Sequence, residues 1–112
     1  MFTYNATVIR VIDGDTLHVT ADLGFHVHTN QTIRLARINA FEMTEPRGVV
    51  ARAYVLNLIA ACVAMRITTT KQEKYGRWLA EVMLQRKTTD VDWFNLNDDL
   101  VRHSHAVYHS YD

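Results

Sequence analysis

Short β-rich runs separated by glycine-containing turns constrain the fold of this chain more than any other feature. Residues 8–12 and 16–20 flank the dipeptide Asp13-Gly14, which is a strong β-hairpin signal. A second turn is predicted at Leu23-Gly24, and extended runs follow at residues 25–29 and 32–38. These patterns predict three strands in the first third of the chain.

The spacing of apolar residues becomes helical at residues 48–61. Thr44, with Pro46 just beyond it, is the expected helix start. The face expected to pack on the core comprises Val49, Ala53, Leu56 and Ala60, widened by Tyr54, Leu58 and Ile59.

Strand character returns at residues 65–70 and 78–84, with a turn at Lys74-Tyr75-Gly76. A second helix is expected to begin near Asn95, a good N-cap, and to bury Leu96, Leu100 and Val101. The order of three strands, a helix, two strands and a helix predicts a mainly β, α+β fold. A five-stranded, partly open OB-fold-like barrel with a helix at one end fits this order.

Composition places the chain in a narrow class. Its 112 residues suffice for one domain, 1–112, and 48% are hydrophobic, which excludes a disordered tail. No apolar run reaches membrane-spanning length, and residues 1–5 do not resemble a signal peptide. Cys62 is the only cysteine and cannot form an internal disulfide, so we expect a cytoplasmic location.

The charge distribution points to a local anion site. The formal net charge is zero, which argues against a general nucleic-acid coat. Residues 34–77 nevertheless contain eight Lys and Arg against three acids.

Four motifs occur in a fixed order along the chain. They are Val-Ile-Asp-Gly-Asp-Thr ending at Thr16, Arg-Leu-Ala-Arg-Ile-Asn-Ala-Phe-Glu ending at Glu42, Lys-Tyr-Gly-Arg-Trp-Leu-Ala-Glu-Val ending at Val82, and Asn-Leu-Asn-Asp-Asp-Leu-Val-Arg-His ending at His103. Asp-Gly-Asp alone is common in hairpins, whereas all four together closely resemble the staphylococcal nuclease-like (thermonuclease) family from about residue 8 to residue 108.

The resemblance implies a role for each motif residue. Asp15 is expected to be a carboxylate ligand of Ca²⁺, with Asn39 at the position of a second aspartate ligand and Ala40 supplying a backbone carbonyl. Glu42 is expected to engage the attacking water. Arg34 and Arg77 are expected to bind phosphate, Lys74 and Tyr75 to lie near the bound nucleotide, and Arg37 to be a surface residue that could contact the substrate backbone.

The residue types suit this chemistry. Carboxylate, amide and carbonyl oxygens are ligands for a hard cation, and a guanidinium is planar, always charged and bidentate toward phosphate. Taken singly, Asp15 would more often be a turn residue and each arginine a surface ion-pair partner. Five of the six histidines, at 26, 28, 103, 105 and 109, form two clusters that match no zinc signature, and Trp78 and Trp93 are expected to be core or rim residues.

The chain departs from the founding member of the family at three points. Asn39 replaces a charged ligand, and Phe41 replaces a proline in the loop that presents Glu42. The third helix of the family is absent, so Tyr108 and Tyr111 or a homodimer partner are expected to cover the surface it would occupy. We therefore expect a Ca²⁺-dependent phosphodiesterase that cuts DNA or RNA with low sequence specificity and leaves 3′-phosphates. The alternative is a weak or inactive barrel that serves as a nucleic-acid-binding or protein-interaction module.

Overall fold

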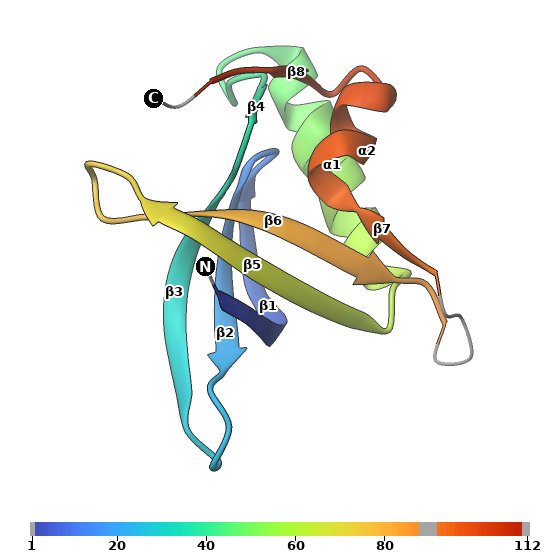
Figure 1. Cartoon of the computed structure of the whole chain (residues 1–112). Coiled ribbons are helices and arrows are strands. Elements are labelled where there is room, and N and C mark those ends of the chain that lie inside the picture. Colours follow the sequence, from blue (N-terminus) through green and yellow to red (C-terminus); the bar gives the residue numbers. More distant parts are fainter. Residues whose placement is uncertain (1, 88–91, 111–112) are drawn as a thin grey trace.

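Five long strands form a closed barrel in the computed structural model, which describes residues 2–87 and 92–110 (Figure 1). Antiparallel neighbours follow the order β3-β2-β1-β5-β6, and a parallel pairing of β3 with β6 closes the barrel. The predicted five-stranded, OB-like α+β fold is therefore confirmed. The strands are β1 (Phe2–Asp13), β2 (Thr16–Asp22), β3 (His28–Leu35), β5 (Ala64–Gln72) and β6 (Trp78–Gln85).

Three short strands were not predicted. β7 (Trp93–Asn95) extends the sheet beside β6, while β4 (Ile38–Ala40) and β8 (Ala106–Tyr108) pair with each other. A run of three residues is too short for a period-2 pattern to stand out. The β4–β8 pair returns the C-terminal part of the chain to the segment that carries Asn39 (Figure 1).

Helix α1 (Pro46–Ala60) packs on the barrel through a face other than the predicted one. Its buried residues are Gly48, Ala51 and Val55, and its N-cap is Glu45 rather than Thr44. Apolar residues occur on every side of this helix, so the small side chains that allow close approach decide which face packs. Of the predicted face, Val49, Ala53, Leu56 and Ala60 are exposed, whereas Tyr54, Leu58 and Ile59 are half-buried.

The β1–β2 hairpin fits closely beneath this helix. Asp13 pairs with Thr16, so the turn consists of Gly14 and Asp15, one residue later than predicted. A Cβ atom on Gly14 would lie 2.9 Å from the Cβ of Ala40 and 3.1 Å from that of Ala51. Glycine is therefore needed here for close approach to β4 and α1.

Two predicted strand segments are instead interrupted by residues with positive φ. Phe25 (φ 55°) and His26 (φ 61°) lie in the β2–β3 loop, so the strand expected over residues 25–29 begins only at His28, and His26 does not share a strand face with His28. Arg37 (φ 68°) follows the end of β3 and breaks the expected run over residues 32–38. β-Branched and aromatic composition suggested strands at both places, but the backbone turns there.

Helix α2 (Leu96–Arg102) begins as predicted. The Asn95 side chain accepts a hydrogen bond from the Asp98 backbone N–H at 3.0 Å. Leu96 and Leu100 are fully buried, and Val101 packs at the edge of the core. Neither this helix nor α1 is long and apolar enough to cross a membrane, nor is any other helix within the described ranges.

Candidate functional site

Asp15 and Arg34 form a buried ion pair where the β1–β2 turn meets the end of β3. A guanidinium nitrogen of Arg34 lies 3.0 Å from Asp15 Oδ2, and each side chain is 8% exposed. The pairing of Thr16 with Arg34 across β2 and β3 fixes this approach. The same Asp15 oxygen accepts the Ala40 backbone N–H at 2.8 Å. Residues from two separate motifs thus converge on one carboxylate.

Arg34 also binds the segment that carries Asn39. Its Nη2 donates to Asn39 Oδ1 at 2.8 Å, and its Nη1 donates to the carbonyl oxygens of Leu35 (3.2 Å) and Ile38 (3.3 Å). One cationic nitrogen therefore lies between the oxygens of Asp15 and Asn39. Sequence reasoning placed Arg34 on phosphate and did not anticipate that it would hold both proposed metal ligands.

The Asp15 carboxyl has an unusual affinity for protons. Burial and a hydrogen bond with the Asp13 carboxyl raise its pKa to about 6, against the opposing effects of Arg34 and the Ala40 N–H. Burial acts in the same sense on Asp13, but its hydrogen bonds with Asp15 and Thr16 keep the pKa of Asp13 below its usual value. Asp13 also accepts the Asp15 backbone N–H at 3.1 Å, which fits its predicted role as a turn residue.

Arg77 is held at the base of the β5–β6 hairpin. Its Nη2 lies 3.0 Å from Glu73 Oε2, and its backbone N–H donates to Glu73 Oε1 at 3.0 Å. The side-chain hydrogen bond that Arg77 donates to Glu73, together with the Glu73 charge, raises the pKa of Arg77, with smaller contributions from the charges of Asp15 and Asp13. The Arg77 Nε is buried and lacks a hydrogen-bond partner in the described structure. This guanidinium therefore retains a donor that is not yet used.

The hairpin turn carries the two predicted nucleotide-contacting residues. Tyr75 is 73% exposed, and its ring lies 5.0 Å from Lys74 Nζ and 6.0 Å from the Arg77 guanidinium carbon. Gly76 has φ 87°, a conformation that favours glycine and gives the predicted turn. An exposed ring flanked by two cations is suited to stacking on a base.

One cavity of about 510 Å³ joins these two groups of residues. It brings together five of the predicted site residues, namely Arg34, Asn39, Lys74, Tyr75 and Arg77. His109 also lines it, with its backbone N–H bonded to the Arg37 carbonyl at 2.7 Å. We did not place His109 at the site from sequence, because only the long-range β4–β8 pairing brings it there.

Glu42 lies on an exposed loop just before α1 and does not line this cavity. The loop is pressed against the first turn of the helix, since a Cβ on Gly48 would lie only 1.8 Å from the Glu42 carbonyl oxygen. Phe41 packs under the guanidinium of Arg47 at 4.0 Å. An aromatic contact to α1 thus restrains the position where the founding member of the family has proline.

Arg37 is committed to ion pairs. Its guanidinium makes a bidentate contact with Glu81 at 2.6 and 2.8 Å and a third contact with Asp98 at 2.9 Å. Hydrogen bonding to Glu81, followed by Asp98, raises its pKa above the usual range. Tyr108 also donates to Asp98 at 2.9 Å, so the predicted return of the tail through Tyr108 is confirmed, whereas Tyr111 lies outside the described residues. The alternative of a homodimer stays a prediction.

The donor set is chemically suited to Ca²⁺. Within residues 2–87 and 92–110, no group of three or more His, Cys, Asp or Glu side chains could hold a metal ion, so the zinc interpretation gains nothing. The oxygens of Asp15 and Asn39, however, already converge on one cationic nitrogen, whereas Ala40 contacts Asp15 through its backbone N–H and not through its carbonyl. A small set of oxygens completed by water is acceptable to Ca²⁺.

A family model described as "Staphylococcal nuclease homologue" matches residues 32–112. This chain belongs to that family. The match includes Arg34, Asn39, Ala40, Glu42 and Arg77, whereas Asp15 precedes it and is tied to the matched segment by the ion pair with Arg34. No curated protein matches the chain. Family membership makes it a nuclease-like domain, and the barrel is of the expected type.

Proposed function

We propose that this chain is a Ca²⁺-dependent phosphodiesterase that hydrolyses DNA or RNA with little sequence preference. The observation that carries the proposal is the cavity lined by Arg34, Asn39 and Arg77. Two guanidiniums on one cavity wall match the charge that a phosphodiester develops as it is attacked.

Each residue has a distinct task in this proposal. Arg77 binds a phosphate oxygen from the cavity wall, while Glu73 fixes the orientation of its guanidinium. Arg34 supplies a second positive charge from beneath the cavity. Tyr75 and Lys74 contact the base and backbone of the substrate. Arg37, held by Glu81 and Asp98, contributes only at the edge.

Glu42 orients or deprotonates the attacking water. Its exposed loop lets water reach the carboxylate, and the close contact with Gly48 limits its movement. When bound by Asp15, Asn39 and the Ala40 carbonyl, Ca²⁺ supplies Lewis-acid stabilisation of phosphate charge. Family resemblance favours cleavage that leaves 3′-phosphates.

Digestion of labelled single- and double-stranded DNA and RNA tests the proposal, with Ca²⁺, Mg²⁺, Mn²⁺ or chelator. We expect Ca²⁺-dependent cleavage that falls about a hundredfold or more in Glu42→Ala, Arg34→Ala and Arg77→Ala, as for groups that act on the transition state. Glu45→Ala is the matched control, because Glu45 is an exposed acid of the same loop whose side chain is ion-paired with Arg47 at 3.5 Å. Equal rates for Glu42→Ala and the parent would contradict the mechanism.

One observation favours a second candidate, a barrel that binds nucleic acid without cutting it. Arg34 is only 7% exposed and is already bonded to Asp15 and Asn39, so it occupies the place between the two proposed metal ligands. Electrophoretic mobility shifts in chelator separate the candidates. Tight binding that needs Arg77, with no cleavage by any tested metal, would establish the binding module.

A further inference from the structure

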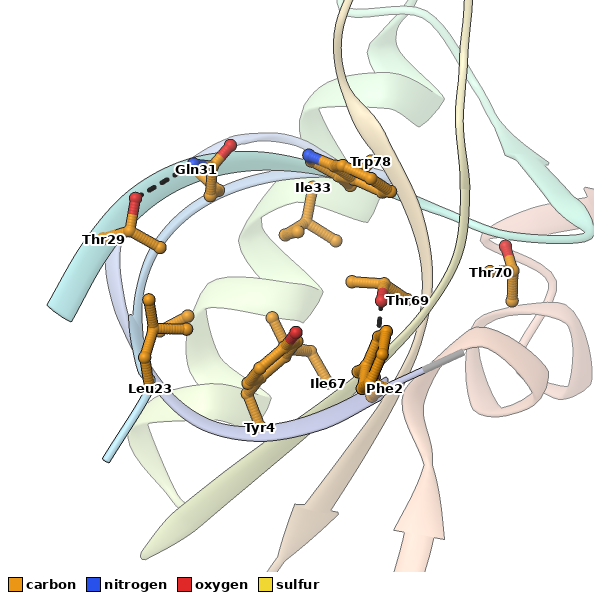
Figure 2. Close-up of a pocket in the computed structure, with 11 residues that line it drawn as sticks. Phe2, Tyr4, Leu23, Thr29, Gln31, Ile33, Ile67, Thr69, Thr70 and Trp78 are labelled. Atoms are coloured by element: carbon orange, nitrogen blue, oxygen red, sulfur yellow. Dashed lines mark hydrogen bonds between the residues drawn. The ribbon is translucent and has the colours of Figure 1, made fainter. Parts of the chain in front are cut away.

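The barrel has an open mouth at the end of the β1–β2 hairpin that lies away from Gly14. Figure 2 shows the strands curving around a cavity of about 370 Å³ there, with side chains pointing inward from several strands. Small-molecule sites commonly have volumes of about 300–1,000 Å³ and mostly apolar walls. The mouth fits that description and takes no part in the proposed hydrolysis.

Aromatic rings surround the opening. Phe2 and Tyr4 project from β1, and Trp78 projects from the start of β6 on another side (Figure 2). Phe2 is 68% exposed although it could pack in the cavity it borders. Rings arranged in this way can stack on a flat ligand. The lining contains only uncharged residues, completed by Ala21, Leu23, Thr29, Gln31, Ile33, Ile67, Thr69 and Thr70.

Polar groups on the wall provide both donors and acceptors. Gln31 Nε2 donates to Thr29 Oγ1 at 3.0 Å, which leaves the Gln31 carbonyl oxygen directed to other partners. Three polar groups on the wall make no hydrogen bond to protein in the described structure. They are the Gln31 side-chain oxygen, the Trp78 indole N–H and the Tyr4 hydroxyl. A flat, neutral ligand with hydrogen-bonding groups at its edge satisfies both the rings and these atoms.

The mouth and the phosphate-site cavity lie on the two faces of the same strands. Ile33 and Trp78, which are paired between β3 and β6, line the mouth, while the adjoining Arg34 and Arg77 line the other cavity. Neighbouring residues of β3 and of the start of β6 thus serve the two cavities, so a nucleic-acid strand held at the arginines lies beside the part of the barrel wall that also carries the mouth.

We propose that the barrel mouth is a second binding site, which takes one unstacked nucleobase. Only the choice of a nucleobase over other flat neutral rings rests on the proposed function. The base stacks against Trp78 and Phe2 and exchanges hydrogen bonds with Gln31 and Tyr4. A base of the bound strand and a free nucleoside share this chemistry.

Nucleosides without phosphate test the mouth separately from hydrolysis. In a Trp93→Phe protein, Trp78 is the only remaining tryptophan and reports on the mouth by fluorescence. We expect thymidine and adenosine to give a saturable change in chelator, so that failure of the Ca²⁺ mechanism does not affect the result. Phe2→Ala and Gln31→Ala should each weaken binding by about fivefold or more. Phe25→Ala, at an exposed ring outside the mouth, should leave it unchanged.

A second arm identifies the source of the base and does not depend on the tryptophan variant. An oligothymidylate and an abasic deoxyribose-phosphate oligomer of equal length are compared by NMR at the Trp78 indole N–H of the parent chain. A shift with the oligothymidylate alone supports a strand base as the occupant, and a shift with free thymidine alone supports a nucleoside.

Three outcomes would overturn the proposal. If neither thymidine nor adenosine gives a saturable change in Trp78 fluorescence, the mouth is not a nucleobase site. Toluene that binds as tightly as thymidine would show an unselective apolar cavity. If sedimentation shows that the parent is a dimer and that Phe2→Ala is a monomer, the mouth is a contact between copies of the chain.

Discussion

The Arg34 guanidinium lies 3.0 Å from Asp15 Oδ2 and 2.8 Å from Asn39 Oδ1, so one cation holds both proposed Ca²⁺ ligands together. In Arg34→Gln, Ca²⁺ binding should tighten by about tenfold, about 1.4 kcal/mol, because a positive charge beside the site is removed. Hydrolysis should fall over the same change. Calorimetric Ca²⁺ titration and initial cleavage rates measure the two effects, with Arg47→Gln as the exposed control. Weaker Ca²⁺ binding in Arg34→Gln would show that Arg34 organises the ligands more than it repels the ion.

Asn39→Asp should tighten Ca²⁺ binding by about tenfold or more, since ligand charge strongly tunes Ca²⁺ affinity. In the absence of the ion, two adjacent carboxylates are expected to repel each other and so to lower apo-protein stability. Because Arg34 Nη2 lies within hydrogen-bond distance of both side chains, that loss of apo-protein stability should be smaller than expected. Calorimetry and thermal melts in chelator test both statements. An unchanged Kd would show that Asn39 does not ligate the ion.

Gly48→Ala should lower both stability and activity. The added Cβ would meet the Glu42 carbonyl oxygen at 1.8 Å, so the loop must move away from the helix. We expect a loss of about 1–3 kcal/mol in the free energy of unfolding and a reduced cleavage rate at temperatures where the variant is folded. Val49→Ala, at the exposed neighbouring position, is the control for urea melts and rate measurements. A fully active Gly48→Ala protein would show that the position of the Glu42 loop is not critical.

Glu73→Gln should remove a contribution to stability that depends on pH. The hydrogen bond from the Arg77 side chain, helped by the Arg77 and Tyr75 backbone N–H groups, lowers the pKa of Glu73 from 4.5 to about 2. A carboxyl with a lowered folded-state pKa stabilises the fold fully above its unfolded value and loses that effect as the pH falls. The stability advantage of the parent over Glu73→Gln should therefore be constant above about pH 4.5 and shrink toward pH 2. Urea unfolding at pH 6 and pH 3 measures it, and an equal difference at both values would contradict the shift.

Asn97→Ala should be more destabilising than its position on α2 suggests. The buried Asn97 amide donates to the Ala36 and Ala80 carbonyls at 2.9 and 3.0 Å and accepts the Val82 N–H at 3.1 Å. Its removal should cost about 3 kcal/mol or more, because buried backbone groups lose their partners. The N-cap variant Asn95→Ala should cost only about 1 kcal/mol. Chemical denaturation of both proteins compares them, and equal losses would contradict the central role of Asn97.

Sequence patterns predicted the long elements and missed the connections between them. The Asp13-Gly14 signal, the Asn95 cap and the Gly76 turn depend on local chemistry, and each identified a real element boundary to within a residue. The packing face of α1 was wrong because many of its residues are apolar, and the choice depends on what Gly14 and Ala40 leave room for.

The candidate site was predicted as a set of residues but not as a network. The motifs identified Arg34, Asn39 and Arg77 as site residues, and all three line one cavity. The contact of Arg34 with Asp15 joins residues far apart in sequence, and the arrival of His109 depends on a strand of three residues. No local pattern encodes either relationship. The buried hydrogen bonds of Asn97 are hidden for the same reason, since asparagine is usually a surface residue.

The pairing of β4 with β8 also sets the order in which the protein can be completed during synthesis. Asn39 lies opposite Val107, so the segment that carries two proposed ligands cannot form its strand pairing until residues about seventy positions later have been synthesised. The barrel strands and α1 leave the ribosome well before that strand does. The segment that carries Asn39 and Ala40 thus reaches its place in the described molecule only when residues 106–108 are available to pair with it.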